Sequence, residues 1–210
     1  MSFRFGGYNY HADGRIASKT TWRYDSEGSI QSTTVTHYEY NADGRMDSET
    51  TWEYDSEGSI QSTTVTHYEY NHSGQLVEKL EEREHSKYSY RSANLTEYAY
   101  DKGILTAEKR LYKQDDEDYE IASTTTYSNF DNDGNPRHAE IVYGYNSITN
   151  IDYIYDAYGN VLVETGVSID DYSNFSTTWE YTFKYVPIKK SSLSPHWSEA
   201  DEYIYWDGKG

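Results

Sequence analysis

A stretch of thirty residues that is written twice constrains this chain more than any other feature. Residues 9–38 and 39–68 align without a gap, and the run from Tyr24 to Asn41 recurs letter for letter from Tyr54 to Asn71. A repeat of this length behaves as one supersecondary unit stacked beside its copies, so it predicts the architecture before any single residue is considered. We therefore expect a chain without residues 39–68 to fold.

Two turns punctuate each repeat. One reads Asn41-Ala42-Asp43-Gly44-Arg45 and the other Asp55-Ser56-Glu57-Gly58-Ser59, with Asn or Asp first and Gly fourth. This order is typical of a three-residue hairpin loop, in which a type I turn is followed by a left-handed glycine that makes a G1 bulge. The glycines predicted to form such structural turns are Gly14, Gly28, Gly44, Gly58, Gly74, Gly134 and Gly159.

The loop type predicts which residues face one another across each hairpin. The expected pairs are Tyr54 with Ile60, Trp52 with Ser62, Thr50 with Thr64, Tyr40 with Met46, Tyr38 with Ser48 and Thr34 with Trp52. Because opposed residues point to the same side of a sheet, even-numbered positions would form one face of Tyr, Trp, Ile, Met, Ser and Thr. The odd-numbered positions, among them Glu49 and Glu53, would form a charged face.

The same pairing predicts a stagger of two residues for every two strands. A constant stagger closes a sheet into a barrel. Strand and loop lengths give about 12–14 strands. We therefore predict an all-β fold, a single up-and-down antiparallel meander closed into a β-barrel over residues 1–186, with residues 187–210 closing or capping it. Residues 75–83 are compatible with a short helix, but their position after a turn favours a strand.

Composition agrees with a sheet and narrows the partners. Tyr accounts for 25 of 210 residues, and aromatic and β-branched side chains suit pleated surfaces. The formal charge of −18 repels phosphate backbones and anionic headgroups, so neither nucleic acid nor membrane insertion is expected. There is no cysteine, which excludes disulfides and thiolate sites. No signal peptide or apolar span is visible, and we expect a monomer that needs no cofactor.

A recurring phrase resembles a known family of repeats. Tyr-x-Tyr-(Asp/Asn)-x-x-Gly-(Arg/Asn/Gln)-aliphatic occurs at residues 38–46, 68–76 and 153–161. It is similar to the YD repeats of Rhs, toxin-complex and teneurin proteins, and more closely to soluble porin-like β-barrel domains of secreted Bacteroidetes proteins. The resemblance implies an extracellular, cell-surface or periplasmic β protein and supplies no catalytic residues. The identity of the two copies also suggests an engineered, hairpin-duplicated barrel, which would be expressed in the cytoplasm.

The aromatic side chains are the best candidates for binding. A barrel of about twelve strands is too wide for side chains to fill, so rings and hydroxyls would line a lumen. Such a surface suits a glycan or a small amphiphile, although the same rings would equally well serve as a core. The candidate ligand-binding residues are Trp22, Trp52, Tyr24, Tyr54, Tyr38 and Tyr68.

Metal and catalytic signals are weak by comparison. Asp131 and Asp133 begin a stretch similar to a calcium loop, and Asp115 and Asp116 lie in an acidic cluster, but both stretches are first of all turn formers. No metal centre and no catalytic residues are predicted, because no histidine pair or nucleophile motif has the required spacing. The leading hypothesis is a non-enzymatic β-barrel with a structural or binding role. The alternatives are a secreted carbohydrate- or amphiphile-binding module, and a calcium-dependent surface protein or hydrolase.

Overall fold

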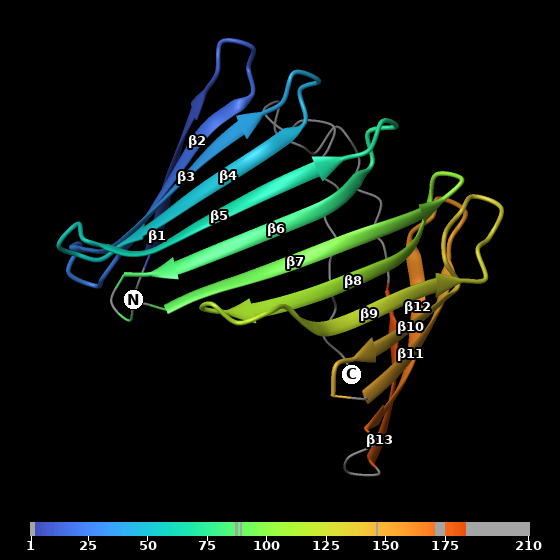
Figure 1. Cartoon of the computed structure of the whole chain (residues 1–210). Coiled ribbons are helices and arrows are strands. Elements are labelled where there is room, and N and C mark those ends of the chain that lie inside the picture. The colour runs from blue at the N-terminus through green and yellow to red at the C-terminus, as the bar shows by residue number, and fades with distance from the viewer. Residues whose placement is uncertain (1–2, 87, 89, 146, 171–174, 184–210) are drawn as a thin grey trace. The chain divides into compact units, whose positions relative to one another are not determined.

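The protein is an antiparallel meander of β-strands, seen here in a computed structural model that describes residues 3–86, 88, 90–145, 147–170 and 175–183 (Figure 1). No helix occurs among these residues. The strands are β1 (Phe3–Tyr10), β2 (Ile16–Tyr24), β3 (Ile30–Tyr40), β4 (Met46–Tyr54), β5 (Ile60–Tyr70), β6 (Leu76–His85), β7 (Tyr90–Asp101), β8 (Ile104–Gln114), β9 (Glu120–Ser128), β10 (His138–Tyr143), β11 (Ser147–Tyr155), β12 (Val161–Asp170) and β13 (Phe175–Thr182). The uncertain segment 75–83 belongs to strand β6, as its position after a turn predicts.

Strand order in the sheet follows chain order from β1 to β13. The thirteen described strands fall within the predicted number. β1 and β13 lie at the two ends of this order, so the pairings of the described residues do not close the sheet and the predicted barrel is not confirmed. No described segment is an apolar helix long enough to cross a membrane.

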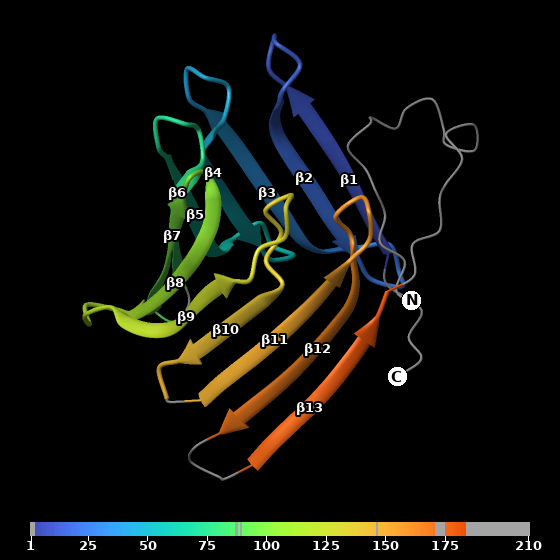
Figure 2. The same cartoon turned by 90° about the vertical axis from the view of Figure 1, so that its right-hand side faces the viewer.

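The chain divides into two compact units, residues 1–124 and residues 125–210. Unit 1 holds β1 to β8 and most of β9, and unit 2 holds β10 to β13, whose hairpins are clearest in Figure 2. The predicted closing segment 187–210 lies outside the described residues. Each unit is therefore considered by itself below.

The turns are built as the sequence predicts. All seven predicted glycines have positive φ, between 81° and 87°. In the turn after β4, the backbone N–H of Gly58 donates to the carbonyl of Asp55, and the N–H of Asp55 donates to Ser59. Oδ1 of Asp55 accepts the N–H groups of Glu57 and Ser59 at 2.9 Å each. The side chain thus pre-forms the turn, which explains why Asp or Asn stands first.

The pairing beyond each turn differs from the prediction. Tyr54 faces Ile60 as expected, but the register then shifts, so Trp52 faces Thr63 instead of Ser62. One extra residue, Gln61, forms a bulge, and every later pair moves by one position. The other wrong predictions have the same cause: Thr50 faces Val65, Tyr38 faces Glu49 and Thr34 faces Glu53. The predicted division into an aromatic even face and a charged odd face is therefore wrong.

The predicted stagger survives this correction. Val35 pairs with Trp52, which pairs with Thr63, two residues short of the repeat equivalent Val65. The two bulges shift the register equally on successive hairpins, so their effects cancel over a full repeat. The sheet of unit 1 therefore has the slip of two residues for two strands that the repeat predicts.

Few side chains are fully buried. The buried apolar residues among those described are Ala93, Ala139 and Ile151, and the buried polar ones include Ser62, Thr66 and Thr149. Small residues at strand centres allow long neighbours to lie across them, as Ser62 does for Glu53 and Arg83. Stability of such a sheet must therefore come largely from turns and cross-strand pairs.

Candidate functional site

One edge of unit 1 carries a series of turns that contact one another, here called the ladder edge: residues 11–15, 41–45, 71–75 and 101–104. The guanidinium of Arg15 lies over the Tyr40 ring, 4.4 Å from its centre. A Cβ built on Gly44 would lie 3.4 Å from Nη1 of Arg15. The side chain that follows one turn glycine thus covers the Tyr and Gly of the next turn.

The next rung repeats this contact. The Arg45 guanidinium lies 5.6 Å from the centre of the Tyr70 ring. A Cβ on Gly74 would collide with the same guanidinium, so the position accepts only glycine while Arg45 stays in place. At the third rung Gln75 replaces arginine, and its Nε2 donates to the carbonyl of Gly103 at 2.8 Å.

Tyrosine hydroxyl groups add hydrogen bonds between neighbouring hairpins at the ladder edge. Tyr40 Oη donates to the carbonyl of Ile16 at 3.0 Å, and Tyr100 Oη donates to that of Leu76 at 2.9 Å. In unit 2, Tyr155 Oη donates likewise to the carbonyl of Pro136 at 2.7 Å. In these three cases, the tyrosine directly before a turn donates a hydrogen bond to the preceding hairpin.

The opposite edge of unit 1, called the open edge, has the turns at residues 25–29 and 55–59. Nothing lies within 4 Å of a Cβ built on Gly28 or Gly58. The arginine contact that Gly44 and Gly74 receive on the ladder edge is therefore absent at these two turns, although the backbone geometry is the same. Sequence reasoning did not find this difference, whose signal is the arginine or glutamine that directly follows Gly14, Gly44 and Gly74.

One face of unit 1, called the tyrosine face, carries Tyr8, Tyr38, Tyr68 and Tyr98, which recur every thirty residues. These rings pair across the strands with Lys19, Glu49, Lys79 and Glu108 in turn. The charge at this position therefore alternates in sign along the sheet. A second row does the same, with Arg23, Glu53 and Arg83 at equivalent positions.

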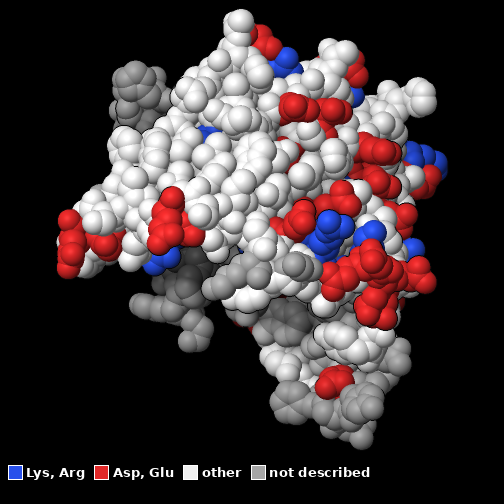
Figure 3. All heavy atoms as spheres, turned by 60° about the vertical axis from the view of Figure 1, so that its left-hand side comes forward, with Lys and Arg blue, Asp and Glu red and all other residues white. Residues whose placement is uncertain are grey.

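Contacts between rows follow the alternating charges. Arg83 Nη2 lies 3.0 Å from Glu53 Oε2, and both contact the hydroxyl of Ser62. Tyr68 Oη donates to Glu49 Oε1 at 3.1 Å, while Lys79 lies over the same ring. Burial and the nearby Glu49 carboxylate raise the pKa of Tyr68, so this phenol stays a hydrogen-bond donor at neutral pH. Acidic side chains nevertheless outnumber basic ones on the surface, as the face shown in Figure 3 illustrates.

The six aromatic residues predicted to bind a ligand do not share one face. The face opposite the tyrosine face, called the tryptophan face, carries Trp22 and Trp52. Trp22 stacks on Phe5 with ring centres 5.8 Å apart, and Trp52 meets His37 edge-on at 5.0 Å. Tyr24 and Tyr54 lie on the same strands as these two residues and pair with Ile30 and Ile60 beside the open-edge turns. Tyr38 and Tyr68 point to the tyrosine face, so the set forms no single surface, and ligand binding stays a prediction.

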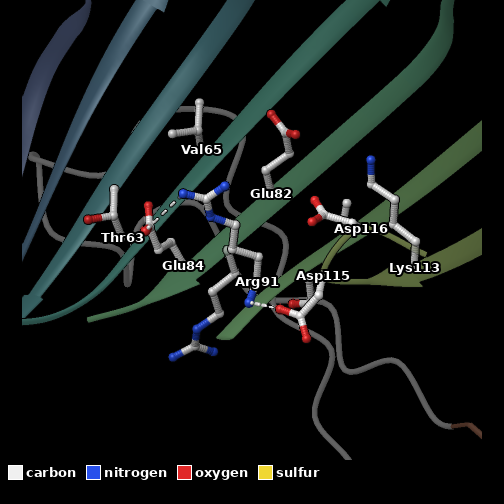
Figure 4. Close-up of a pocket in the computed structure, with 11 residues that line it drawn as sticks. Thr63, Val65, Glu82, Glu84, Arg91, Lys113, Asp115 and Asp116 are labelled. Atoms are coloured by element: carbon white, nitrogen blue, oxygen red, sulfur yellow. Dashed lines mark hydrogen bonds and ion pairs between the residues drawn. The ribbon is translucent and has the colours of Figure 1, made fainter. Parts of the chain in front are cut away.

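A hollow of about 360 Å³ lies on the tryptophan face of unit 1, and its lining is mixed in charge (Figure 4). Arg91 bridges to Glu84 at 3.5 Å, and Asp115 Oδ1 accepts the backbone N–H of Arg91 at 2.9 Å. Lys113 lies 4.7 Å from the centre of the Tyr119 ring. Arg91, Glu84, Asp115 and Lys113 at this hollow thus have partners within the protein.

Unit 2 has a hollow of about 410 Å³ over β11 to β13. The Trp179 indole lies against Gly166, where a Cβ would collide with it, and its Nε1 donates to Glu164 Oε1 at 3.2 Å. Burial and the Glu164 carboxylate raise the pKa of Tyr153 to about 12. No described residue here combines a nucleophile with a base within hydrogen-bond distance.

The weak calcium candidates are engaged in turns. Asp131 Oδ1 accepts the N–H groups of Asp133 and Asn135, and these bonds hold the pKa of Asp131 below its ordinary value. Asp115 caps β7, as described above, and Asp116 follows it at the edge of the unit 1 hollow. Within the described residues, no three acidic or histidine side chains form a group that could hold a metal ion.

Comparison with solved structures shows a distant likeness. No protein-family model matches the chain, and no curated protein matches it. The chain is similar to part of the crystal structure of TcdB2-TccC3-TEV, at 15% identity and a TM-score of 0.36. The match covers 86% of this chain and 11% of that one. The chain thus spans a small part of that structure's length, and a likeness at this level carries no argument about function.

Proposed function

We propose that this chain is a non-enzymatic scaffold, a repeat-built sheet of the YD-repeat type with a structural or binding role. The ladder edge is the observation that carries the proposal, because neighbouring hairpins there are joined by an arginine or glutamine side chain and, at Tyr40 and Tyr100, also by a phenol hydroxyl. Such a device joins neighbours in a series and requires no ligand. Its chemistry serves extension and shape, which are the properties of a scaffold.

The finer features of the proposal each have their own support. Closure into a barrel is supported by the stagger of unit 1, since a constant stagger curves a sheet toward closure. An extracellular or cell-surface location follows the family resemblance of the Tyr-x-Tyr-Asp-x-x-Gly phrase, and a monomeric state is proposed alongside it. The absence of catalysis is part of the proposal and is supported by the engagement of Asp131, Asp115 and Glu53 in turns and ion pairs.

The test is removal of one repeat, in two versions of equal length. Deletion of residues 39–68 joins Tyr38 to Glu69, and deletion of residues 9–38 joins Tyr8 to Glu39. Each restores the phrase Tyr-Glu-Tyr and removes two strands, so both shortened chains should unfold cooperatively in denaturant with β-type circular dichroism. The second should be the more stable, because it keeps the Arg83–Glu53 pair, whereas the first places Arg23 beside Arg83 across one strand.

A half-repeat deletion is the matched control. Removal of residues 39–53 takes out half as many residues and only one strand. All later strands then run in the opposite direction, so their turns change from one edge of the sheet to the other. This chain should lose cooperative unfolding. The scaffold proposal fails if both thirty-residue deletions are unfolded, or if the half-repeat deletion is as stable as they are.

A further inference from the structure

Strand β1 is paired on one side only among the described residues, with β2. Its end has the same construction as the end of β5, sixty residues later: Tyr8, Tyr10, Gly14 and Lys19 correspond to Tyr68, Tyr70, Gly74 and Lys79. Both strands have a register shift directly before the turn, and both turn glycines have positive φ, 87° and 81°. The two strands therefore offer the same surface to whatever lies on their preceding side.

At β5 that preceding side is occupied by β4. Arg45 places its guanidinium over Tyr70 and against Gly74, and Glu49 accepts the hydroxyl of Tyr68. These contacts come from the last turn residue before β4 and from a residue of β4 four positions later, while the backbones of β4 and β5 pair in antiparallel register. They define the chemistry that this kind of strand end receives.

At β1 the corresponding groups are uncovered. Tyr8 is 49% exposed and Tyr10 is 61% exposed. A Cβ built on Gly14 would meet nothing within 4 Å, whereas at Gly44 and Gly74 it meets an arginine. Lys19 already lies over the Tyr8 ring, 5.8 Å from its centre, as Lys79 does over Tyr68. Next to β1, the described structure thus has the tyrosine and the glycine of a ladder-edge contact, but no guanidinium lies against Gly14.

We propose that the free edge of β1, together with Tyr8, Tyr10 and Gly14, is a docking surface for a β-hairpin of the same chemistry as β3–β4. The incoming strand pairs antiparallel with β1. An arginine directly after its turn glycine lies over Tyr10 and against Gly14. A carboxylate four residues later accepts the hydroxyl of Tyr8.

Charge selects among hairpins of this type. The tyrosine face of unit 1 begins with three cations, Arg4, Lys19 and Arg23. A hairpin with the carboxylates of Glu49 and Glu53 continues the alternation of sign, whereas one with Lys19 and Arg23 at these positions sets like charges across one strand. The surface therefore distinguishes hairpins by the sign of the charge at these two positions, while the turn sequence Ala-Asp-Gly-Arg is shared by both.

The binding test uses two labelled peptides and the full chain. One peptide has the sequence of residues 31–54 and the other that of residues 1–24, which is its equivalent in the first copy. By fluorescence anisotropy, the first should bind saturably and more tightly than the second, with the difference shrinking as salt is added. Hydrogen exchange should show the β1 amides that point away from β2 exchanging freely in the chain alone and becoming protected when the first peptide binds.

Variants assign the contacts. Arg45→Ala in the peptide should weaken binding about two- to fivefold, the range expected for an exposed cation over an aromatic ring. Tyr10→Ala in the full chain should have the same effect, and the two changes together should cost no more than either alone. Tyr158→Ala is the control, because this ring is 90% exposed and belongs to unit 2. It should leave the affinity unchanged.

A fusion covers the case in which a free hairpin peptide does not fold. Residues 31–60 placed before Met1 continue the repeat in register, since Ser2 then follows at the position of Ser62. This fusion should raise the denaturant midpoint and protect β1, and a fusion with residues 1–30 should do so less. The proposal is overturned if the β1 amides that point away from β2 are already protected in the free chain, if Tyr10→Ala leaves peptide affinity unchanged, or if neither peptide nor fusion protects these amides.

Discussion

The two units of the chain share their turns and differ in their strands. The turn led by Asp156 in unit 2 accepts the N–H groups of Tyr158 and Asn160, just as Asn71 in unit 1 accepts those of Ser73 and Gln75. Both units also show the register shift beside such turns. The strands between the turns, in contrast, have lost the repeat in unit 2. Turn chemistry is thus the part of this architecture that tolerates least change.

What stabilises the strands is different in each unit. Unit 1 uses rows of tyrosine and alternating charge, with small polar residues such as Ser62, 1% exposed, beneath them. Unit 2 buries Ala139 and Ile151 together with the small polar residues Ser147 and Thr149, and it lays the Trp179 indole on Gly166. A sheet of this kind can therefore be held by periodic pairs or by local packing, provided that the turns set the register.

The largest expected effect compares two glycines that each lie against a tryptophan, Gly166 in unit 2 and Gly7 in unit 1. Gly166→Ala should destabilise unit 2 by about 1–3 kcal/mol, because the new Cβ must displace the Trp179 ring. Gly7→Ala in unit 1 is the matched change, since its Cβ would lie 3.6 Å from Trp22, an ordinary contact. Denaturant midpoints should fall for the first and not for the second. Equal effects would mean that Trp179 packing is not what holds unit 2.

The next effect compares the two edges within unit 1. Gly58→Val on the open edge should cost about 1–2 kcal/mol through the left-handed backbone alone. Gly74→Val should cost more, because the side chain also displaces Arg45 from the ladder edge. The difference, measured by denaturant midpoint, should vanish in an Arg45→Ala background. No loss for Gly58→Val would show that the turn assignment is wrong.

Low pH should destabilise the turns that begin with aspartate and should not affect those that begin with asparagine. Accepted N–H bonds lower the pKa of Asp131 and Asp156 in unit 2 below the ordinary value of 3.8. Their stabilisation is therefore present above that value and is lost as pH falls through the lower folded pKa. Asn41 and Asn71 make the same bonds in unit 1 without titrating. The double change Asp131→Asn and Asp156→Asn should thus flatten the acid side of the stability curve, and an unchanged curve would contradict this origin.

The smallest effect concerns a row of like charges that unit 1 tolerates. Glu78 faces Glu69 on one side and Glu97 on the other, and burial together with these carboxylates raises its pKa above 4.5. Ionised Glu78 therefore costs stability at neutral pH, and the cost disappears as pH falls below its raised pKa. Glu78→Gln should stabilise the chain by on the order of 0.5 kcal/mol at pH 7 and by nothing at low pH. A loss at pH 7 would indicate a favourable role for the carboxylate.

Sequence alone predicted the elements that depend on local chemistry. The seven predicted glycines form left-handed turns because only glycine enters that backbone region without cost. Each such turn can be predicted from the few residues that form it. The strand assignment of residues 76–85 and the stagger of unit 1 follow from the same turns. These features need no knowledge of distant residues.

The faces could not be predicted in the same way. The bulge residues Ala17, Asp47, Gln61 and Val77 share no side-chain type, so nothing in the sequence marks the shift that moves Trp52 opposite Thr63. The ladder edge depends on long side chains that reach a hairpin about thirty residues away, as Arg15 reaches Gly44. The alternation of Lys19, Glu49 and Lys79 was visible in the sequence, but it acquires meaning only once the strands are known to lie side by side.

The contrast between the two edges of unit 1 also makes the molecule easy to modify in one direction. Turns 25–29 and 55–59 touch no neighbour through their glycines, so a foreign loop grafted there would displace no contact of the kind that Arg45 makes at Gly74. Two such sites, thirty residues apart in identical sequence, would hold a pair of displayed peptides at a fixed separation on the same rim. A turn whose glycine meets no neighbour is thus a place for attachment, and the duplication sets the distance between two such places.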